Sequence, residues 1–401
     1  MPTDILTPDA IHFKSIRLGD VRAFASPQCL EFTDENGAVS RWNLILGENG
    51  VGKTTLLQAL AVMRPVPAFD EPITGKSDDA EKADDDGTPR LVEAEFSAHA
   101  NEEIRRFIRR NGTRTMKIGA ELVDTETGMG LSVSAEITGH AKDLISAEFP
   151  KFRHQLRSRG PLVIGYGAGR HIGDHNLDEV AARSTTQSLF SGAIDLYDAA
   201  VLIEKLDYAA QIDKAGKDLG RLEMLKTAVA SLLPGDLTVK DIDVRGPMIE
   251  GRDPDRSGVF VRTPSGMTPL TDLSIGNQAM FALTVDLAWR LFNAFPESDT
   301  PLSESAIVLI DEVDLHAHPR WQRNLRRNFL EQFPKVQFIV TTHNPVIAQE
   351  ALSEGGTVAV VRVLAQRENE DRKWVEEGRF RPAGGDFQGI GVYRSDRGSC
   401  G

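Results

Sequence analysis

The pattern of apolar and polar positions predicts strands in the first third of the chain. Residues 11–33 alternate between apolar and polar, as in two short strands, and residues 91–138 return to the same period of two. Between these stretches, residues 42–46 (WNLIL) form a short apolar run that is typical of a buried strand. We therefore expect the N-terminal part to combine strands of a half-exposed lobe with one strand of the core.

A helical period replaces this alternation in the middle of the chain. From about residue 185 to 233, leucines recur at helical spacing, which predicts a helical insertion. Strands are expected to resume at 237–246 and 258–263. Helices and apolar runs then alternate, with a helix at 276–295, a strand at 306–310, a helix at 319–333 and strands at 336–341 and 357–364.

The apolar run at 42–46 leads into a glycine-rich segment that matches G-x-x-x-x-G-K-[ST] without a mismatch. Glycines at positive φ let backbone N–H groups converge on phosphate oxygens, and the following helix adds the positive end of its dipole. Lys53 is expected to reach the β- and γ-phosphates of ATP, and Thr54 to offer its hydroxyl to Mg²⁺. The predicted nucleotide-binding residues are Gly47, Glu48, Asn49, Gly50, Val51, Gly52, Lys53, Thr54 and Thr55.

A second candidate site follows the apolar run at 306–310. Asp311 and Glu312 come directly after this run, at the kind of strand end where open α/β sheets bind ligands. Asp311 is expected to hold Mg²⁺, usually through water, and Glu312 to polarise the attacking water. Phosphoryl transfer mainly requires positioning and charge neutralisation, which these carboxylates supply together with Lys53 and Thr54.

His316 and His318 allow another interpretation, because H-x-H spacing places two imidazoles on one face of an extended segment, as a zinc site requires. No third ligand lies nearby at a recognisable spacing, and Pro319 indicates a turn and a helix start. We therefore expect both histidines to belong to the loop after the carboxylates.

Composition narrows the class of protein. The 59 acidic and 46 basic residues give a formal net charge of −13 at pH 7, so no general basic field attracts nucleic acid or anionic membrane. Cys29 and Cys400 are far apart and form no C-x-x-C, which argues against a disulfide framework and a cysteine zinc site. No signal-peptide core and no apolar run of ~18 residues are visible. We expect a cytoplasmic protein with no membrane partner.

Two charged features of the sequence bear on the protein surface and on its possible partners. An acidic stretch punctuated by proline and glycine, residues 70–90, predicts a mobile insertion. Arginine clusters keep nucleic acid open as a partner, although solvated helix faces are the favoured interpretation in an acidic chain. These arginines are Arg105, Arg106, Arg109, Arg110, Arg114, Arg320, Arg323, Arg326 and Arg327.

Together, the motifs resemble those of ABC-type ATPases, in the branch that contains SMC, RecF and OLD-family proteins. LSIGNQ resembles the signature of that family, IDEVDLHAHP its Walker B motif and D-loop, and FIVTTHNP its switch strand. The resemblance implies that Ser274 and Gly276 contact the γ-phosphate. It also implies that Asp314 belongs to the D-loop and that His343 is the switch histidine.

The signature segment also has a physical interpretation. Ser274 is a suitable N-cap for an amphipathic helix, and a capped helix N-terminus can bind an anion. In the family, this second anion site meets ATP held by the P-loop of another subunit, which implies a homodimer or higher oligomer with shared ATP sites. The chain departs from the family at Asn277, and residues 166–170 stand where the Q-loop glutamine is expected.

The resemblance implies an α/β fold: an ABC-ATPase head with a mixed or parallel P-loop sheet core, an antiparallel β lobe and a helical insertion. A single ATPase domain in two lobes is expected over residues 1–401. Its predicted parts are the P-loop and β lobe at 1–180, the helical insertion at 181–245, the signature, Walker B and switch lobe at 246–364, and a tail at 365–401.

Two functions from different classes remain open. In the first, the protein binds and hydrolyses ATP as a sensor or scaffold that controls a separate effector protein, such as a nuclease, in bacterial anti-phage defence. In the second, it is a RecF-like DNA-repair ATPase that clamps DNA in an ATP-dependent dimer. The middle is too short for SMC-type arms, and the 365–401 tail is shorter than the ~40 residues that a separate domain needs. The first function is favoured.

Overall fold

In the computed structural model, contacts divide the chain into two compact units. Unit 1 comprises Met1–Val163, Ser305–Leu309 and Gln337–Gly401, and unit 2 comprises Ile164–Glu304 and Ile310–Val336. The structure describes residues 7–24, 27–34, 36–67, 90–94, 107, 114–139, 144–148, 152–154, 160–172, 184–191, 194–213, 216–245, 258–315, 322, 324–353, 357–368 and 373–382. Residues 70–89 of the insertion predicted at 70–90 and the H-x-H pair lie outside the described residues.

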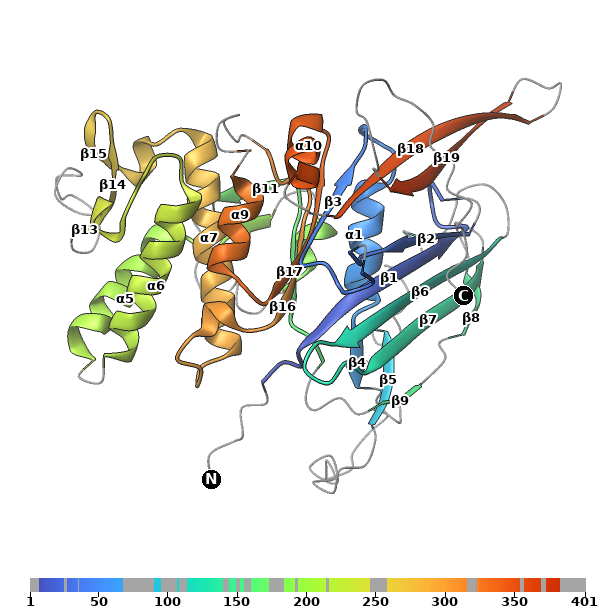
Figure 1. The fold of residues 1–401 in the computed structure, drawn as a ribbon, viewed down its shortest axis with the longest axis horizontal. Coiled ribbons are helices and arrows are strands. Elements are labelled where there is room, and N and C mark those ends of the chain that lie inside the picture. The colour runs from blue at the N-terminus through green and yellow to red at the C-terminus, as the bar shows by residue number, and fades with distance from the viewer. Residues whose placement is uncertain are drawn as a thin grey trace. The chain divides into compact units, whose positions relative to one another are not determined.

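A six-stranded mixed sheet carries the P-loop strand (Figure 1). Strand β3 pairs in parallel with β17 on one side and with β18 on the other, and β18 pairs antiparallel with β19. The mixed sheet core is therefore confirmed. In order across the sheet, its strands are β10 (Val163–Tyr166), β16 (Ala306–Ile310), β17 (Val336–Thr342), β3 (Trp42–Leu46), β18 (Thr357–Glu368) and β19 (Lys373–Pro382).

The predicted antiparallel lobe is also present, as a five-stranded sheet in unit 1. Alternate side chains of its central strand are buried, as the sequence period requires. Its order is β2 (Gln28–Glu31), β1 (Ile11–Gly19), β6 (Arg114–Asp124), β7 (Gly130–Gly139) and β8 (Leu144–Glu148). A smaller antiparallel sheet contains β4 (Pro65–Pro67), β5 (Arg90–Ala94) and β9 (Phe152–His154).

One buried side chain joins the two larger sheets within unit 1. The amide of Phe13 on β1 donates to Oε1 of Gln337 on β17, and Nε2 of Gln337 donates to the carbonyl of Phe13, each at 2.8 Å. The pairing of β1 with β6 shifts register between Phe13 and Ser15. Gln337 therefore provides the donor and the acceptor that a neighbouring strand would otherwise provide.

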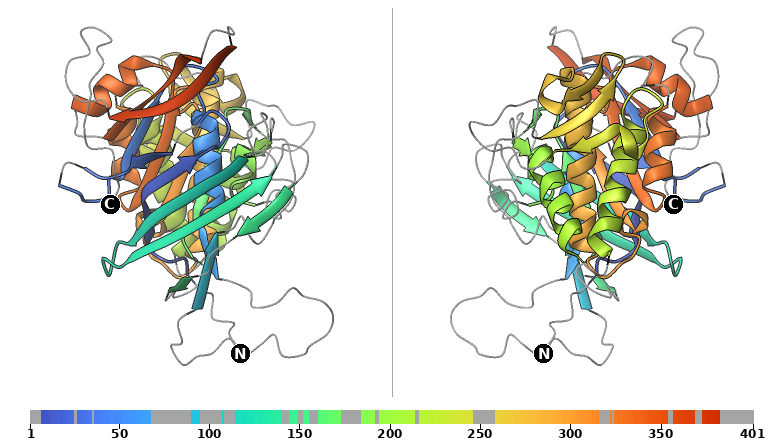
Figure 2. Two further views of the ribbon diagram at one scale, coloured as in Figure 1. Left: turned by 90° about the vertical axis from the view of Figure 1, so that its right-hand side faces the viewer. Right: turned by 90° about the vertical axis from the view of Figure 1, so that its left-hand side faces the viewer.

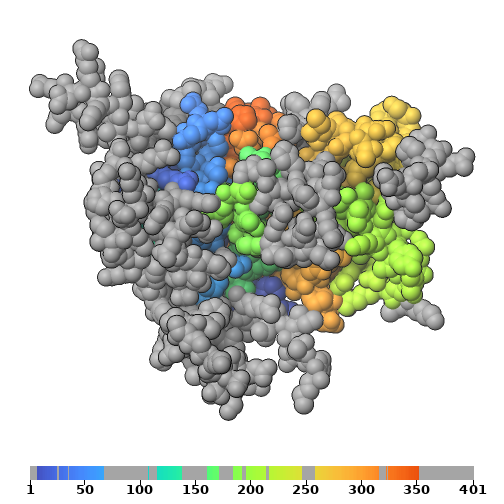
Figure 3. Space-filling model, turned by 180° about the vertical axis from the view of Figure 1, so that it is seen from behind, coloured from blue at the N-terminus to red at the C-terminus, as the bar shows by residue number. Residues whose placement is uncertain are grey.

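Unit 2 contains most of the described helices, which pack together as Figure 2 shows. They are α5 (Ala199–Ile212), α6 (Lys217–Leu232), α7 (Ile275–Ala294) and α9 (Leu325–Gln332). Helices α5 and α6 expose several large apolar side chains, including Tyr208 and Ile212. Figure 3 shows this part of the chain in yellow-green at the surface. Unit 2 also contains β11 (Arg170–Ile172) paired in parallel with β12 (Ile194–Leu196).

The expectation of continuous helix from about 185 to 233 is wrong at its start. Residues 187–189 form a 3₁₀ turn, and 194–196 form β12 before α5 begins at Ala199. The parallel partner of β12 is β11, which is about twenty residues away in sequence. A local helical period carries no information about such a partner, so the strand was not predictable from it.

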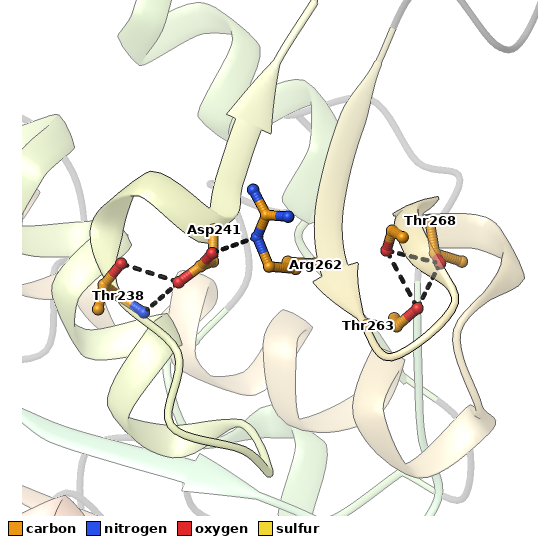
Figure 4. Close-up of polar contacts among 6 residues, drawn as sticks. Thr238, Asp241, Arg262, Thr263 and Thr268 are labelled. Atoms are coloured by element: carbon orange, nitrogen blue, oxygen red, sulfur yellow. Dashed lines mark hydrogen bonds and ion pairs between the residues drawn. The ribbon is translucent and has the colours of Figure 1, made fainter.

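The strand predicted at 237–246 is shorter, because a 3₁₀ turn occupies Val239–Asp241 and β13 covers only Ile242–Val244. Asp241 accepts from the amide and hydroxyl of Thr238 at 2.9 and 2.8 Å and from Arg262 (Figure 4). The Thr238 donors lower the pKa of Asp241. These contacts favour a capped turn over a strand. Beside it, β14 (Val259–Thr263) and β15 (Gly266–Pro269) complete a small sheet.

Further differences concern the ends of predicted elements and one cysteine. Residues 365–401, expected as a tail, contain the end of β18 and all of β19, which pairs with it. Cys29 on β2 is disulfide-bonded, although the cysteine pattern argued against a disulfide framework. Among the described residues, no helix is long and apolar enough to cross a membrane.

Candidate functional site

The glycine-rich segment forms a loop between β3 and helix α1 (Lys53–Val62). Gly50 and Gly52 have φ of 81° and 105°, in the left-handed region. A Cβ atom at Gly52 would lie 3.0 Å from the ring of Phe24, so a side chain there would meet both strain and a neighbour. The loop is tied to the end of β17, because the amide of Gly47 donates to the carbonyl of Thr342.

Lys53 folds back over this loop. Its Nζ donates to the carbonyls of Gly47 and Glu48 at 2.7 and 2.8 Å, and the residue is only 5% exposed. The N-cap of α1 is Gly52, so no side chain caps the helix, and no acidic residue occupies the first turn. An uncapped helix N-terminus beside a buried cation suits a phosphate group.

The two threonines after Lys53 differ in burial. Thr54 is exposed, which suits the predicted contact of its hydroxyl with Mg²⁺, whereas Thr55 is buried. Arg22, a residue that the motifs did not identify, donates from Nη1 to Gln58 at 3.2 Å and to Thr55 at 3.4 Å. Its guanidinium also lies 5.7 Å from the ring centroid of Phe107. Arg22 therefore supports the helix that follows the P-loop.

The carboxylate pair follows β16, whose five residues are all buried. The amide of Asp311 donates to the carbonyl of Tyr166 at the end of β10, and Asp311 is 4% exposed. Asp314 is also buried, and Glu312 is partly exposed. Glu312 has φ of 47°, one of three positive values among the described non-glycine residues. The backbone therefore turns sharply at the residue predicted to act on water.

A second residue without a predicted role, Arg170, contacts this turn. Nη1 donates to the carbonyls of Asp311 at 2.7 Å and Gly167 at 3.1 Å, and Nη2 donates to the carbonyl of Glu312 at 2.9 Å. Burial lowers the pKa of Arg170, and the charges of Asp311 and Glu312 oppose that shift. In the segment 166–170, where the Q-loop glutamine was expected, the Tyr166 carbonyl and the Arg170 guanidinium therefore contact the backbone of Asp311 and Glu312.

The predicted N-cap at the signature is confirmed. Ser274 precedes α7, and its Oγ accepts from the amide of Asn277 at 3.4 Å. Nε2 of Gln278 donates to the carbonyls of Thr271 and Leu273 at 2.6 and 2.9 Å, which fixes the turn before the helix. Gly276 lies in the first turn.

Helix α7 is not amphipathic as expected, because every residue from Met280 to Ala288 is buried. Its interior holds Asp286, which accepts from the Tyr166 hydroxyl and from Arg290 Nε at 2.6 Å each. The amide of Tyr197 donates to the same carboxylate at 3.2 Å. Burial, then the charge of Asp286, raises the pKa of Tyr166 well above its usual value. The signature helix is therefore joined to the end of β10 through a buried carboxylate.

His343 follows β17 and is exposed. The amide of Asn344 donates to the hydroxyl of Thr342 at 2.9 Å, and Oδ1 of Asn344 accepts from the amide of Val346 at 3.0 Å. These bonds set the turn that leads into α10 (Pro345–Ser353). His343 thus projects from a turn with defined backbone contacts.

The predicted site residues divide between the two units. The P-loop residues 47–55 and His343 belong to unit 1, and Asp311, Glu312 and Asp314 belong to unit 2 with the signature residues 274–276. Among the described residues, no cluster of three or more histidine, cysteine, aspartate or glutamate side chains could hold a metal ion.

The arginines considered for DNA contact are described only in part. On α9, Arg327 pairs with Glu331 at 3.9 Å and donates to Asn324 at 3.2 Å, as expected of a solvated helix face. Arg326 lies on the same helix. The side chains of the others lie outside the described residues: Arg105, Arg106, Arg109, Arg110, Arg114, Arg320 and Arg323.

Comparison with known proteins gives one family model that covers most of the chain. This model, described as an AAA domain, putative AbiEii toxin, Type IV TA system, matches residues 43–348. The Septu protein PtuA of Bacillus mycoides (strain KBAB4) is 26% identical over 349 residues, which cover 86% of this chain and 39% of PtuA.

A second curated protein matches over a shorter segment, and one solved structure aligns along most of the chain. The Retron Vc95 probable ATPase of Vibrio cholerae serotype O1 biovar El Tor is 42% identical over 83 residues, covering 21% of this chain and 16% of that protein. The chain thus spans less than half the length of both curated relatives. The SMC head domain from Thermotoga maritima aligns with a TM-score of 0.44 and 14% identity, over 93% of this chain and 99% of that one.

Proposed function

Because the chain belongs to the AAA-domain family described as putative AbiEii toxin of a type IV TA system, we propose that it binds ATP with Mg²⁺ and hydrolyses it. The observation that supports this proposal most directly is the P-loop. It follows a buried strand, has left-handed glycines, and places Lys53 beside an uncapped helix N-terminus. These features fit the phosphates of a nucleotide.

The other predicted residues receive roles in the same reaction. Thr54 and Asp311 hold Mg²⁺, which neutralises the charge that develops on the phosphates. Glu312 polarises the attacking water and His343 contacts the γ-phosphate. The signature residues Ser274 and Gly276, with Asp314, act on the nucleotide held by a second copy of the chain.

In the cell, we propose that the ATPase is a cytoplasmic sensor or scaffold that controls a separate effector protein in anti-phage defence. The similarity to a Septu protein over 86% of the chain, and to a retron ATPase over a shorter segment, supports this role. A nuclease is one effector class that this role would suit.

Calorimetric titration with ATP and Mg²⁺ tests the nucleotide site. Lys53→Ala should abolish binding, because it removes the cation that pairs with the β- and γ-phosphates. Lys205→Ala, at an exposed position on α5, is the matched control and should bind as the wild type does. Unchanged ATP affinity in Lys53→Ala would remove the P-loop assignment.

Phage challenge tests the proposed role. Bacteria that carry the gene with its native neighbours should resist phage, and Lys53→Ala should lose this resistance while the protein level stays constant. Affinity purification from the same cells should recover the effector. Resistance that does not depend on Lys53 would contradict the role in defence while leaving the ATP site intact.

A further inference from the structure

Arg170 joins two segments that are far apart in sequence. Its guanidinium donates to three backbone carbonyls, and two of them belong to the consecutive residues Asp311 and Glu312. All of these atoms lie within unit 2. The planar fork of an arginine presents its N–H donors at a fixed separation, whereas the ammonium group of a lysine rotates freely and does not fix the spacing of two acceptors.

The backbone that Arg170 contacts has an unusual conformation. Glu312 has φ of 47°, which a residue other than glycine adopts only where its surroundings impose it. The carbonyl of Glu312 accepts from Nη2 of Arg170 at 2.9 Å and from the amide of Leu315 at 3.1 Å. Two donors from different directions therefore fix the peptide group that follows the Glu312 side chain.

The segment that carries Arg170 is itself firmly held. The amide of Gly167 donates to Oγ of Ser188 at 2.9 Å, and a Cβ at Gly167 would lie 2.2 Å from the carbonyl oxygen of Ser188. Directly before it, the hydroxyl of Tyr166 donates to the buried Asp286. Arg170 thus extends from a rigid support towards the carboxylate turn.

We propose that Arg170 is a positioning residue for hydrolysis, which holds the Asp311–Glu312 backbone so that the Glu312 carboxylate faces its water. This inference rests on the proposed ATPase function. Arg170 donates to a backbone carbonyl of each residue of the pair, and its effect on hydrolysis is exerted through the position of Glu312. An error of about 1 Å in the placement of a reacting group can cost ~10²-fold in rate.

Hydrogen exchange of the nucleotide-free protein tests the positioning directly. Arg170→Ala should speed exchange of the Asp311 and Leu315 amides by about tenfold or more, since local opening governs their protection. Arg170→Lys keeps the charge but not the fork and should restore little of that protection. Arg221→Ala is the control, because Arg221 also donates to a backbone carbonyl of unit 2, that of Pro296 at 2.8 Å. It should leave the exchange of 311–315 unchanged.

Steady-state kinetics complete the test. Arg170→Ala should lower kcat for ATP by roughly 10–100-fold with a smaller change in KM, because the predicted phosphate-binding residues 47–55 are unchanged in this variant. If Arg170→Ala does not fold, kcat and KM are compared between Arg170→Lys and the wild type instead. Unchanged exchange at 311–315, or a kcat equal to that of the wild type, would overturn the positioning role. A wild-type protein without ATPase activity but with Arg170-dependent exchange would instead locate the failure in the proposed function.

Discussion

At the scale of single residues, both parts of the candidate site place a cation on backbone carbonyls. Lys53 donates to Gly47 and Glu48, and Arg170 donates to Asp311 and Glu312. A bound phosphate can replace the carbonyl partners of Lys53, since the lysine side chain is a mobile point charge. Arg170 is not expected to exchange its partners for a phosphate, because the carbonyls that it contacts belong to the turn that it supports.

Glu312 is the residue on which turnover should depend most. Glu312→Gln keeps the shape of the side chain but removes the base, so hydrolysis should fall by ~10²–10⁴-fold while ATP still binds. Phosphate release measures the first effect and calorimetry the second. His343→Ala should slow hydrolysis more modestly, because it would contact the γ-phosphate and not the water.

A matched carboxylate separates this effect from general loss of stability. Glu304 accepts from the hydroxyl of Ser298 at 2.7 Å in the same unit, and Glu304→Gln retains an acceptor there. It should hydrolyse ATP normally. Wild-type turnover in Glu312→Gln would show that Glu312 is not the base.

At the scale of elements, the link between the signature helix and β10 is a buried hydrogen bond. Tyr166→Phe removes the hydroxyl that donates to Asp286 at 2.6 Å, whereas Arg290 and the amide of Tyr197 remain. A lost hydrogen bond to a buried charged group should lower the free energy of unfolding by about 1.5–3 kcal/mol. Denaturant titration measures this loss.

The control for Tyr166→Phe is Tyr208→Phe, at a side chain that is mostly exposed on α5, where the change should stay within about 0.5 kcal/mol. The pKa of Tyr166 is higher in the folded than in the unfolded chain, so its stabilising contribution should be complete below about pH 10 and decrease at higher pH. Equal losses in the two variants at pH 7 would contradict the proposed role of the bond.

Elements with a strong local pattern were predictable from the sequence, and those with distant partners were not. The apolar runs that form β3, β16 and β17 lie within a residue or two of their predicted positions, because burial imposes the same pattern wherever the strand pairs. The sequence predicted helix where β12 forms, because the parallel pairing of β12 with β11 leaves no periodic pattern of apolar residues in the local sequence. Arg170 was missed because its contacts are to backbone carbonyls, which any residue type provides.

At the scale of the whole molecule, we expect the working site to be shared between two chains. Ser274→Arg would place a bulky cation at the N-terminus of α7 and would leave the P-loop sequence unchanged. This variant should bind ATP as a monomer but neither dimerise with ATP nor hydrolyse it, because a two-fold pair needs both surfaces. Light scattering and phosphate release measure the two effects.

Mixing two inactive variants gives the decisive comparison. A pair of Ser274→Arg and Lys53→Ala chains would combine one intact P-loop with one intact signature, so at most one of two sites should recover. Full hydrolysis by Ser274→Arg alone, at a specific rate that does not depend on protein concentration, would mean that the site is complete within one chain.

The pairing of β3 has a consequence for the time at which the P-loop can form during synthesis. Both neighbours of β3, the strands β17 and β18, begin after residue 335, about 290 residues later in the chain. At ~5–20 residues per second, a ribosome needs roughly 15–60 s to make that interval. Throughout this period the nascent chain carries the complete glycine-rich motif without the strands that hold its loop. Shorter products released before this point would contain the motif in sequence and lack the structure that binds phosphate.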